Sequence, residues 1–272
     1  MWKEEGEDPE AYLIVQKKKI HILKNISLGE RKKMSINAEQ KITAICLAAG
    51  QGKRMESKVQ KQYLLLEEKP MLYYTLKAFQ DSPVAEIVLV VGAGEEEYCR
   101  KEIAEKYGFS KVKTIVAGGK ERYHSVYNGL QAVKDADYVL IHDGARPFVT
   151  GEIIERCIQG AKERKACVAG MPVKDTIKLA DNERNIAGTP ERSKVWMIQT
   201  PQAFEFALIK NAYTTLIEQE NEGRTTEIPI TDDAMVVEYF MQQKVHLVYG
   251  SYENIKITTP EDLRVAEAFL NA

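Results

Sequence analysis

From residue 41 onward, short runs of apolar, often β-branched residues alternate with longer segments in which apolar residues recur at helical spacing. This alternation is typical of an α/β domain whose central sheet is largely parallel. The predicted strands cover 42–48, 86–92, 112–117, 137–142, 166–171 and 244–249. The predicted helices cover 70–81, 95–107, 122–134, 151–164, 203–221, 232–242 and 260–270.

The segment from about 172 to 200 departs from this alternation. It contains two short β-like stretches, VKDTIKLA and KVWMIQ, separated by a polar turn rich in Asn, Gly and Pro. The pattern predicts a β-hairpin that projects from the sheet as an arm. Because a two-stranded ribbon is only marginally stable alone in water, we expect the arm to pack on something, and a second subunit is a natural candidate.

Residues 1–40 mix blocks of charge with one short apolar patch and show no sustained period. Two interpretations stay open. The segment is either an extension that docks through Tyr12, Leu13, Ile14 and Ile20, or the product of a start site assigned too early, with Met34 as the first residue. Residues 29–33 can be encoded by a purine-rich stretch that resembles a bacterial ribosome-binding site, so the nucleotide sequence tests the second interpretation. Either way, we expect the main domain to cover 41–272.

Composition narrows the possible partners and location. The chain has 272 residues, of which 44% are hydrophobic and 29% charged, enough for one large globular domain. Its net charge of −2 gives no bulk attraction to nucleic acid or to an anionic membrane, so neither is an expected partner. No apolar run approaches the roughly 18 residues of a spanning helix, and the charged N-terminus is unlike a signal peptide, so we expect a cytoplasmic protein. Cys46, Cys99, Cys157 and Cys167 form no C-x-x-C pair and are interpreted as small buried hydrophobic side chains.

The stretch LAAGQGKRMESKVQKQ (47–62) follows the first predicted strand and combines two glycines with four cations. In an open parallel sheet, the turn after the first strand is the usual place for a phosphate group. Gly50 and Gly52 allow close backbone approach to an anion. The cations that would surround it are Lys53, Arg54, Lys58 and Lys61.

Spacing excludes the two common nucleotide-binding loops. A Walker loop requires G-x-x-x-x-G-K-[ST], and a dinucleotide fingerprint requires a third glycine where Met55 stands. The stretch is therefore a different kind of phosphate loop, or else an ordinary strand-to-helix turn with solvated lysines. Short glycine motifs alone do not decide between these.

The segments LAAGQGKRM (47–55) and KQYLLLEEKPMLYYTL (61–76) resemble the signature of sugar-nucleotide pyrophosphorylases. They are more narrowly similar to the 2-C-methyl-D-erythritol 4-phosphate cytidylyltransferases of the non-mevalonate isoprenoid pathway. The further blocks that agree, in order, are GGKERYHSVYNGL (118–130), HDGARPFV (142–149), KDTI (174–177) with R-x-x-x-W-x-x-QTPQAF (192–204), and TDDAMVVE (231–238) with NIKITTPEDL (254–263). The resemblance spans residues 41–270, and five ordered blocks are far more specific than any one.

A few positions depart from the family pattern. The family usually has proline before the loop lysine, and Gln60 stands there in this chain, which implies a less rigid loop. Glu253 supplies the usual acidic residue before Asn-Ile-Lys, and Gly144-Ala145 matches the usual alanine positions after the aspartate of the His-Asp block. None of these departures removes a cation.

The resemblance implies a single Rossmann-like nucleotidyltransferase domain that dimerises through the arm. It also implies transfer of CMP from CTP to 2-C-methyl-D-erythritol 4-phosphate, by direct in-line attack of a phosphate oxygen on the α-phosphorus without a covalent enzyme intermediate. Because the two phosphate groups repel each other, cations and Mg²⁺ must hold them in line. Mg²⁺ would be held mainly through the CTP phosphates, so no protein metal ligands are assigned.

The resemblance also assigns roles to individual residues. Arg54 and Lys61 would contact the triphosphate and stabilise charge at the α-phosphate. Arg192 and Lys256 would position the attacking phosphate. The residues assigned to the nucleotide are Ala48, Ala49, Gly50, Gly52, Gly119, Lys120, Ser125, Asp143 and Ala145. Those assigned to the second substrate are Asp143, Arg146, Thr176, Arg192, Thr200 and Lys256, with Thr176 and Arg192 reaching the neighbouring subunit's site.

Structural alternatives exist for several of these residues. Ser125 could cap a helix, Asp143 could pair with Arg146, and the arm could serve only for dimer packing. The residues Thr231-Asp232 are at least as well explained as a helix cap. His142 is interpreted as a packed strand-end histidine, because a phosphate monoester is already an anionic nucleophile and needs no general base.

Other functions also stay open at this point. Ribitol-5-phosphate cytidylyltransferases share most of these blocks, although LAAG in the first strand, rather than a glycine-richer LAGG, favours the isoprenoid enzyme. A non-catalytic nucleotide-binding protein would be expected to have lost one of the charged positions, and all are present. A uridylyl or guanylyl transferase is possible on fold grounds.

Overall fold

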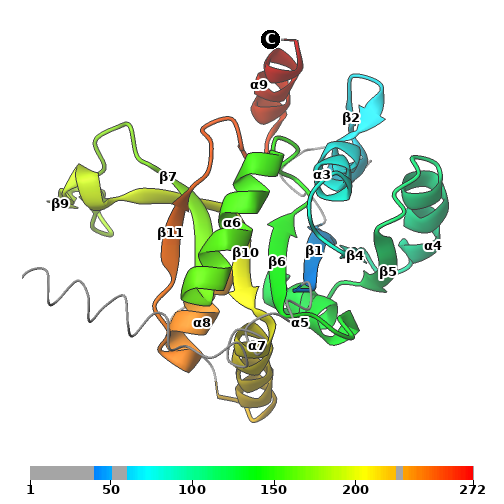
Figure 1. Ribbon diagram of the computed structural model, residues 1–272. Helices are drawn as coiled ribbons and strands as arrows, with labels where there is room; N and C mark the ends of the chain where they lie inside the picture. Colours follow the sequence, from blue (N-terminus) through cyan, green and yellow to red (C-terminus); the bar gives the residue numbers. More distant parts are fainter. Residues whose placement is uncertain (1–39, 51–59, 225–228, 272) are drawn as a thin grey trace, which may run out of the picture. The chain divides into compact units, whose positions relative to one another are not determined.

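The computed structural model describes residues 40–50, 60–224 and 229–271, and the residues from Lys41 to Ala272 form one compact unit. The interpretations of residues 1–39 lie outside the described residues. The unit is built on a seven-stranded sheet in which six strands run parallel and one runs antiparallel (Figure 1). This confirms the predicted α/β class with a mostly parallel central sheet. In spatial order the strands are β11 (His246–Tyr249), β7 (Ala166–Pro172), β10 (Trp196–Glu205), β6 (Tyr138–Asp143), β1 (Ile42–Ala48), β4 (Glu86–Val91) and β5 (Val112–Ala117).

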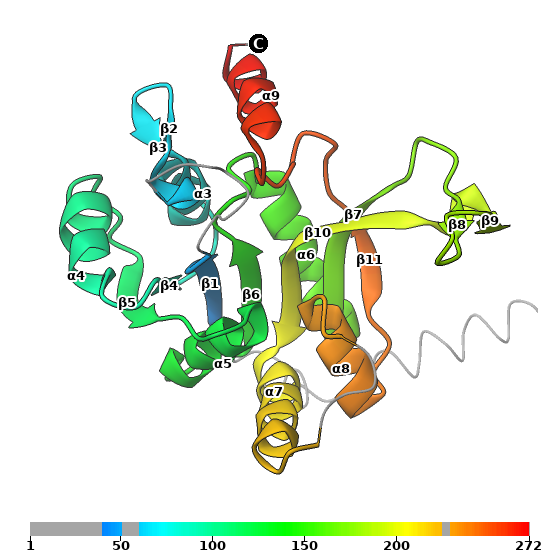
Figure 2. The ribbon, with the colours of Figure 1, turned by 180° about the vertical axis from the view of Figure 1, so that it is seen from behind.

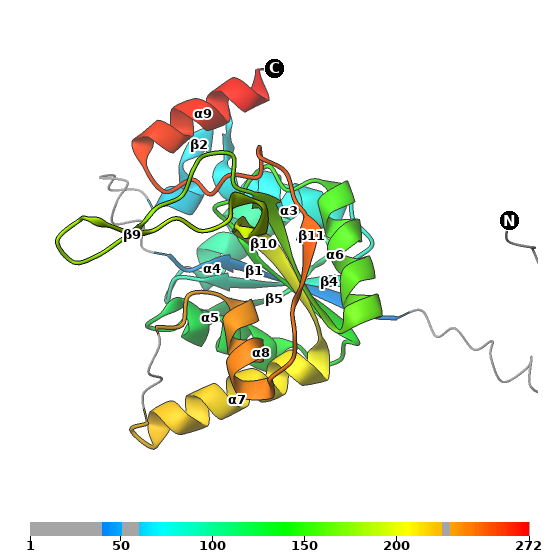
Figure 3. The same cartoon turned by 90° about the vertical axis from the view of Figure 1, so that its left-hand side faces the viewer.

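Helices cover both faces of this sheet, as seen edge-on in Figure 3. The helical elements are α3 (Met71–Gln80), α4 (Glu96–Tyr98), the π-helical η3 (Cys99–Glu105), α5 (Arg122–Ala132), α6 (Gly151–Arg164), α7 (Phe206–Asn221), α8 (Asp233–Met241) and α9 (Pro260–Leu270). One core cluster joins α3, η3 and α6 to strand residues such as Cys46, and a second joins α5, α7 and α8 to alternate residues such as Ile45. Because both faces of the strands β1, β4, β6 and β7 are buried, these strands are apolar at successive positions rather than alternating.

Strand β10 is where the sequence prediction was wrong. The prediction assigned KVWMIQ to the hairpin and began a helix at 203, whereas β10 continues through Glu205 and α7 begins at Phe206. Its second half runs antiparallel between β6 and β7, with a register shift between Ile198 and Gln202. Residues 199–204 are all buried between neighbouring strands, so the strand is stabilised by tertiary pairing rather than by local propensity.

The predicted arm is present and projects from the sheet beyond the ends of β7 and β10 (Figures 1 and 2). At its base Pro172 pairs with Trp196, and at its tip β8 (Leu179–Ala180) pairs with β9 (Ile186–Gly188). The tip turn is closed by the carboxylate of Asp181, which accepts hydrogen bonds from the backbone of Glu183 and Asn185. The paired segments are shorter than predicted, and the returning side includes the 3-10 turn η4 (Arg192–Lys194).

Smaller elements complete the unit. The 3-10 turn η2 (Lys61–Tyr63) and the hairpin of β2 (Leu65–Leu66) and β3 (Lys69–Pro70) lead into α3. All four cysteines are buried with free thiols, which confirms their interpretation as hydrophobic side chains. Among the described residues, no helix has the length and apolar character needed to cross a bilayer.

Candidate active site

A cavity of about 630 Å³ lies at the carboxyl ends of β1, β5 and β6. It brings together ten of the predicted site residues: Ala48, Ala49, Gly50, Lys61, Gly119, Lys120, Ser125, Asp143, Ala145 and Lys256. Four further lining residues had no predicted role: Leu47, Gln62, Glu121 and Arg122. Gly52 and Arg54 lie outside the described residues.

The turn between β5 and α5 forms one wall of the cavity, and its glycines permit a close approach of two loops. A Cβ atom on Gly118 would lie 2.4 Å from the Cβ of Ala49 and 2.8 Å from Oγ of Ser125. The backbone N–H of Gly119 donates to Oγ of Ser125 at 3.0 Å. The N-cap of α5 is Glu121, so Ser125 is not the helix cap and its hydroxyl supports the turn instead.

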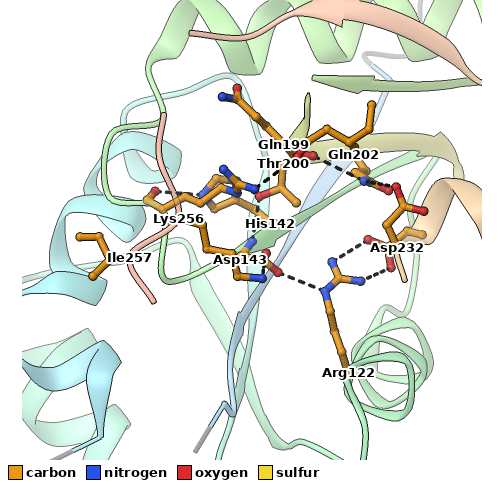
Figure 4. A network of polar contacts seen from close by, with 12 residues as sticks. Arg122, His142, Asp143, Gln199, Thr200, Gln202, Asp232, Lys256 and Ile257 are labelled. Atoms are coloured by element: carbon orange, nitrogen blue, oxygen red, sulfur yellow. Dashed lines mark hydrogen bonds and ion pairs between the residues drawn. The ribbon is translucent and has the colours of Figure 1, made fainter. Parts of the chain in front are cut away.

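Asp143, the last residue of β6, forms ion pairs with two of the cations that line the cavity. Its Oδ2 lies 2.7 Å from Nζ of Lys256 and its Oδ1 lies 3.2 Å from Nε of Arg122 (Figure 4). Burial alone would raise the pKa of this carboxyl, but the charges of Arg122 and Lys256 outweigh burial and hold the pKa well below its ordinary value. Asp143 is therefore ionised, and it pairs with these two cations rather than with Arg146.

Arg122 is the main residue that sequence reasoning missed. Its guanidinium binds the fully buried Asp233 through two parallel hydrogen bonds, of 2.9 and 2.8 Å, and Asp233 also accepts a bond of 2.5 Å from the hydroxyl of Tyr213. Arg122 thus ties α5 to α8 while its Nε faces Asp143. Its position carried a signal, because a cation in the first turn of a helix opposes the helix dipole and calls for an anionic partner.

His142 and Thr200 lie behind Asp143 and hold its backbone. The N–H of Asp143 donates to Oγ1 of Thr200 at 3.1 Å, and that oxygen lies 3.0 Å from Nδ1 of His142. Nε2 of His142 lies 3.2 Å from the carbonyl of Arg146, which can only accept, so the proton is assigned to Nε2 and Nδ1 accepts from Thr200. Burial lowers the pKa of His142 to about 4. This geometry agrees with a packed, neutral histidine.

Lys61 and Lys256 reach the cavity from segments far apart in the sequence. Lys61 belongs to η2, and its Nζ lies 3.5 Å from the carbonyl oxygen of Ile257, the residue after Lys256. Ile257 is fully buried and its N–H donates to the carbonyl of Ala145 at 2.9 Å, which fixes the strand-like segment that carries Lys256. Both lysines line the same cavity.

The remaining predicted substrate residues lie elsewhere in this chain. Nη1 of Arg146 donates to the carbonyl of Asn254 at 2.8 Å, so this side chain braces the segment that leads to Lys256. Arg192 and Thr176 are exposed on the arm, where Nη1 of Arg192 donates to the carbonyl of Lys174 at 3.2 Å. None of these three, nor Thr200, is among the residues that line the cavity.

Asp232 serves as the predicted cap of α8. Its Oδ1 accepts from the N–H of Met235 at 3.0 Å, and its Oδ2 accepts from Nε2 of Gln202 at 3.0 Å (Figure 4). The prediction of a cap at 231–232 is therefore confirmed for Asp232. Gln202 extends the link by accepting from the N–H of Ala234, which attaches α8 to the central strand β10.

The arrangement suits a polyanionic ligand. The cationic residues Lys61, Lys120, Arg122 and Lys256 line the cavity, together with Gly119 of the glycine turn. Within 40–50, 60–224 and 229–271, no three His, Cys, Asp or Glu side chains converge as a metal site. Asp143 supplies an ionised carboxylate, so a divalent cation that arrives with its own phosphate ligands would find one hard oxygen donor here.

Comparisons with known proteins agree with this geometry. Residues 42–272 match the family model described as 2-C-methyl-D-erythritol 4-phosphate cytidylyltransferase. The chain is 52% identical over 231 residues to the protein of that name from Lachnoclostridium phytofermentans, covering 85% of this chain and 97% of that protein. It is 50% identical over 232 residues to the one from Alkaliphilus oremlandii, covering 85% and 95%.

Solved structures give the same result. The fold matches 4-diphosphocytidyl-2C-methyl-D-erythritol synthase from Anaerococcus prevotii with a TM-score of 0.74 and 34% identity, over 86% of this chain and 97% of that one. It matches 2-C-methyl-D-erythritol 4-phosphate cytidylyltransferase from Thermus thermophilus with a TM-score of 0.66 and 29% identity, over 84% and 98%.

Proposed function

The chain belongs to the 2-C-methyl-D-erythritol 4-phosphate cytidylyltransferase family, and from that premise we propose how its cavity transfers CMP from CTP to 2-C-methyl-D-erythritol 4-phosphate. The products are 4-(cytidine 5'-diphospho)-2-C-methyl-D-erythritol and pyrophosphate. The observation that carries the proposal is that Lys61 and Lys256 line one cavity, which Gly119 of the glycine turn and Asp143 also line.

The central task of the site is to bring two mutually repelling phosphate groups together. Lys61, with Arg54, is assigned to the triphosphate, and Lys256 to the attacking phosphate. A phosphate oxygen attacks the α-phosphorus as pyrophosphate leaves, and the charge that develops is stabilised by groups that are already in place. The ammonium of Lys256 is held by Asp143, a contact that would orient it for the incoming phosphate.

The nucleoside is assigned to the wall formed by the ends of β1 and β5. Backbone groups of Ala48, Ala49 and Gly119 and the hydroxyl of Ser125 would bond the polar edge of cytosine, with Asp143 and Ala145 near the ribose. Rigid backbone groups suit base recognition, and the tight packing of Gly118 against Ala49 holds the two loops at a fixed distance. The role of Lys120 would come from its main chain.

Mg²⁺ is assigned to the phosphates of CTP, with the carboxylate of Asp143 as the protein oxygen that fits it. When bound, the ion neutralises charge on the phosphate oxygens. The low pKa of Asp143 keeps this carboxylate ionised and therefore able to accept the ion.

The arm is assigned to a second subunit. Because Arg192 and Thr176 are exposed on the arm and do not line this chain's own cavity, we propose that they complete the site of the partner in a homodimer. Apolar side chains at the arm tip support this assignment, since Leu179 is 57% and Ile186 is 68% exposed. Arg146 and Thr200 do not line this cavity, and their assignment to the second substrate stays a prediction from the resemblance.

The test is a pyrophosphate-release assay with CTP, Mg²⁺ and 2-C-methyl-D-erythritol 4-phosphate. Ribitol 5-phosphate replaces the acceptor in one control, and UTP or GTP replaces CTP in others. We expect turnover that depends on CTP and on the methylerythritol acceptor. Faster turnover with ribitol 5-phosphate, or nucleotide binding without pyrophosphate release, would overturn the proposal.

A further inference from the structure

The carboxylate of Glu95 lies beside the 3-10 turn η2, which carries Lys61. Oε2 of Glu95 accepts a hydrogen bond of 2.8 Å from the hydroxyl of Tyr63, and Oε1 accepts one from Nε2 of Gln60. Gln60 and Tyr63 flank Lys61 and Gln62 in the chain. One side chain, from the loop after β4, therefore binds both ends of the short turn that presents the lysine.

The loop that carries Glu95 is shaped to receive this carboxylate. The N–H of Gly92 donates to Oε2 of Glu95 at 3.1 Å. A Cβ atom on Gly92 would lie 2.7 to 2.9 Å from the carboxylate atoms of Glu95, so a side chain at that position would displace them. The Glu95 carboxylate is thus fixed from the sheet side before it binds η2.

The turn itself is short. A three-residue 3-10 turn has poor hydrogen-bond geometry, and in the part of the chain that the structure describes its backbone bonds run from Tyr63 N–H to Gln60 at 2.9 Å and from Leu64 N–H to Lys61 at 3.2 Å. Gln62, which is buried, adds a bond of 2.5 Å from its Nε2 to Oε1 of Gln60. Glu95 therefore binds Gln60, and Gln60 in turn binds Gln62, so hydrogen bonds connect Glu95 to side chains on both sides of Lys61.

We propose that Glu95 is a positioning residue for Lys61, which it holds in register with the cavity by anchoring Gln60 and Tyr63. The inference rests on the proposed role of Lys61 at the triphosphate. A proline before Lys61 would restrain the turn through its fixed backbone angle. Gln60 stands at that position in this chain, and it restrains the turn through its side-chain hydrogen bond to Glu95 instead. Glu95 itself is not among the residues that line the cavity.

The test is a double-mutant cycle with Glu95→Gln, Lys61→Ala and the combined variant. Glu95→Gln keeps the size of the side chain but replaces one acceptor oxygen with an NH₂ group that faces the donors of Gln60 or Tyr63. We expect Glu95→Gln to lower kcat by about 10- to 100-fold, because small misplacements of a catalytic group are costly. In the Lys61→Ala background the same change should alter kcat by less than about 2-fold, because the group it positions is already gone.

Two further variants separate positioning from folding. Glu95→Ala should reproduce the effect of Glu95→Gln on kcat while the far-UV circular dichroism spectrum stays that of the wild type. Glu97→Ala is the matched control and should leave kcat unchanged, since Glu97 is an exposed carboxylate on the next helix whose ion pairs within the described residues are with Arg100 and Lys101.

The outcomes are distinguishable from a failure of the proposed function. Equal loss from Glu95→Gln in both backgrounds would show a general structural effect and overturn the inference alone. Wild-type kcat in Lys61→Ala would overturn the proposed role of Lys61 and the inference with it. Unchanged kcat in both Glu95 variants would show that η2 needs no such anchor.

Discussion

Nζ of Lys256 lies 2.7 Å from Oδ2 of Asp143, which joins a lysine near the C-terminus to the end of a central strand. The pair is partly open, since the lysine side chain is 36% exposed and the aspartate 11%. A phosphate group can therefore reach the ammonium while the carboxylate continues to orient it. Asp143 keeps Arg122 as a second partner, so the carboxylate is not left isolated when the lysine turns to a ligand.

Removing this ammonium should impair turnover more than folding. We expect Lys256→Ala to lower kcat on the order of 10²–10³-fold, the usual cost of losing one preorganised charge-stabilising contact. Arg122 still compensates Asp143, so the thermal midpoint should change little. Lys244→Ala removes an exposed lysine outside the cavity and is the control. Equal activity of the two variants in the pyrophosphate-release assay would contradict the assignment.

The pair of Arg122 and Asp233 should be needed for stability as well as for the site. Arg122→Ala leaves a fully buried carboxylate without its cation, which typically costs about 3–5 kcal/mol of unfolding free energy. The combined variant Arg122→Met with Asp233→Asn removes both charges and should recover part of that loss. Urea unfolding followed by circular dichroism measures both. If the double variant is no more stable than Arg122→Ala, the unpaired charge on Asp233 is not the cause of the lost unfolding free energy.

Much of the fold was readable from the sequence because local pattern and tertiary structure agree in most elements. The range of α6, for example, matches its prediction, with Thr150 as the cap whose side chain accepts from Ile153. The second half of strand β10 was not readable, because its central part is polar and is held as a strand by pairing with β6 and β7.

The residues of the site were also predictable from the sequence only in part. Motif position placed Lys61, Asp143 and Lys256 together, since segments that end at the same sheet edge converge there. The partners of these residues depend on side-chain packing, so the contact between Arg122 and Asp233, residues that are 111 positions apart, could not be read from spacing. The same holds for the anchoring of η2 by Glu95.

Gly118 should be needed for nucleotide affinity. In Gly118→Ala the new Cβ would lie 2.4 Å from the Cβ of Ala49, so the two loops that face the base must separate. Overpacking of this kind costs about 1–3 kcal/mol, and we expect KM for CTP to rise about tenfold or more. The control is Gly151→Ala, where a Cβ meets open space. Unchanged KM in Gly118→Ala would show that this wall does not contact the nucleotide.

The neutral state of His142 should make stability depend on pH. Its pKa is lowered from an ordinary value of 6.5 to about 4 by burial, so between these values the unfolded chain binds a proton that the folded protein does not. Stability is therefore expected to fall as the pH drops from 6.5 toward 4, by up to about 1.4 kcal/mol per pH unit from this group. The carboxyl of Asp143, whose pKa is also lowered in the folded protein, adds a loss of stability in the same direction as the pH approaches its ordinary value of 3.8, and it contributes little above pH 5.

The measurement is urea unfolding at pH 7 and pH 5 for the wild type and for His142→Gln. Glutamine can donate to the carbonyl of Arg146 and accept from Thr200 without titrating. The difference in stability between the two pH values should therefore be smaller in the variant. If both proteins lose the same stability, the acid sensitivity arises from other groups.

The arm should act in trans. If Arg192 completes the partner's site, a dimer of one Lys61→Ala subunit and one Arg192→Ala subunit contains one doubly defective site and one intact site. Co-expression with two affinity tags isolates this hybrid, and its activity should be about half that of the wild type per dimer, far above either parent variant. A hybrid of Lys61→Ala with Lys256→Ala is the matched control, because both residues line the cavity of the same chain and every site in that hybrid keeps one defect. No recovery in the first hybrid would mean that Arg192 serves its own chain's cavity or none, and the arm would then be left with a role in packing alone.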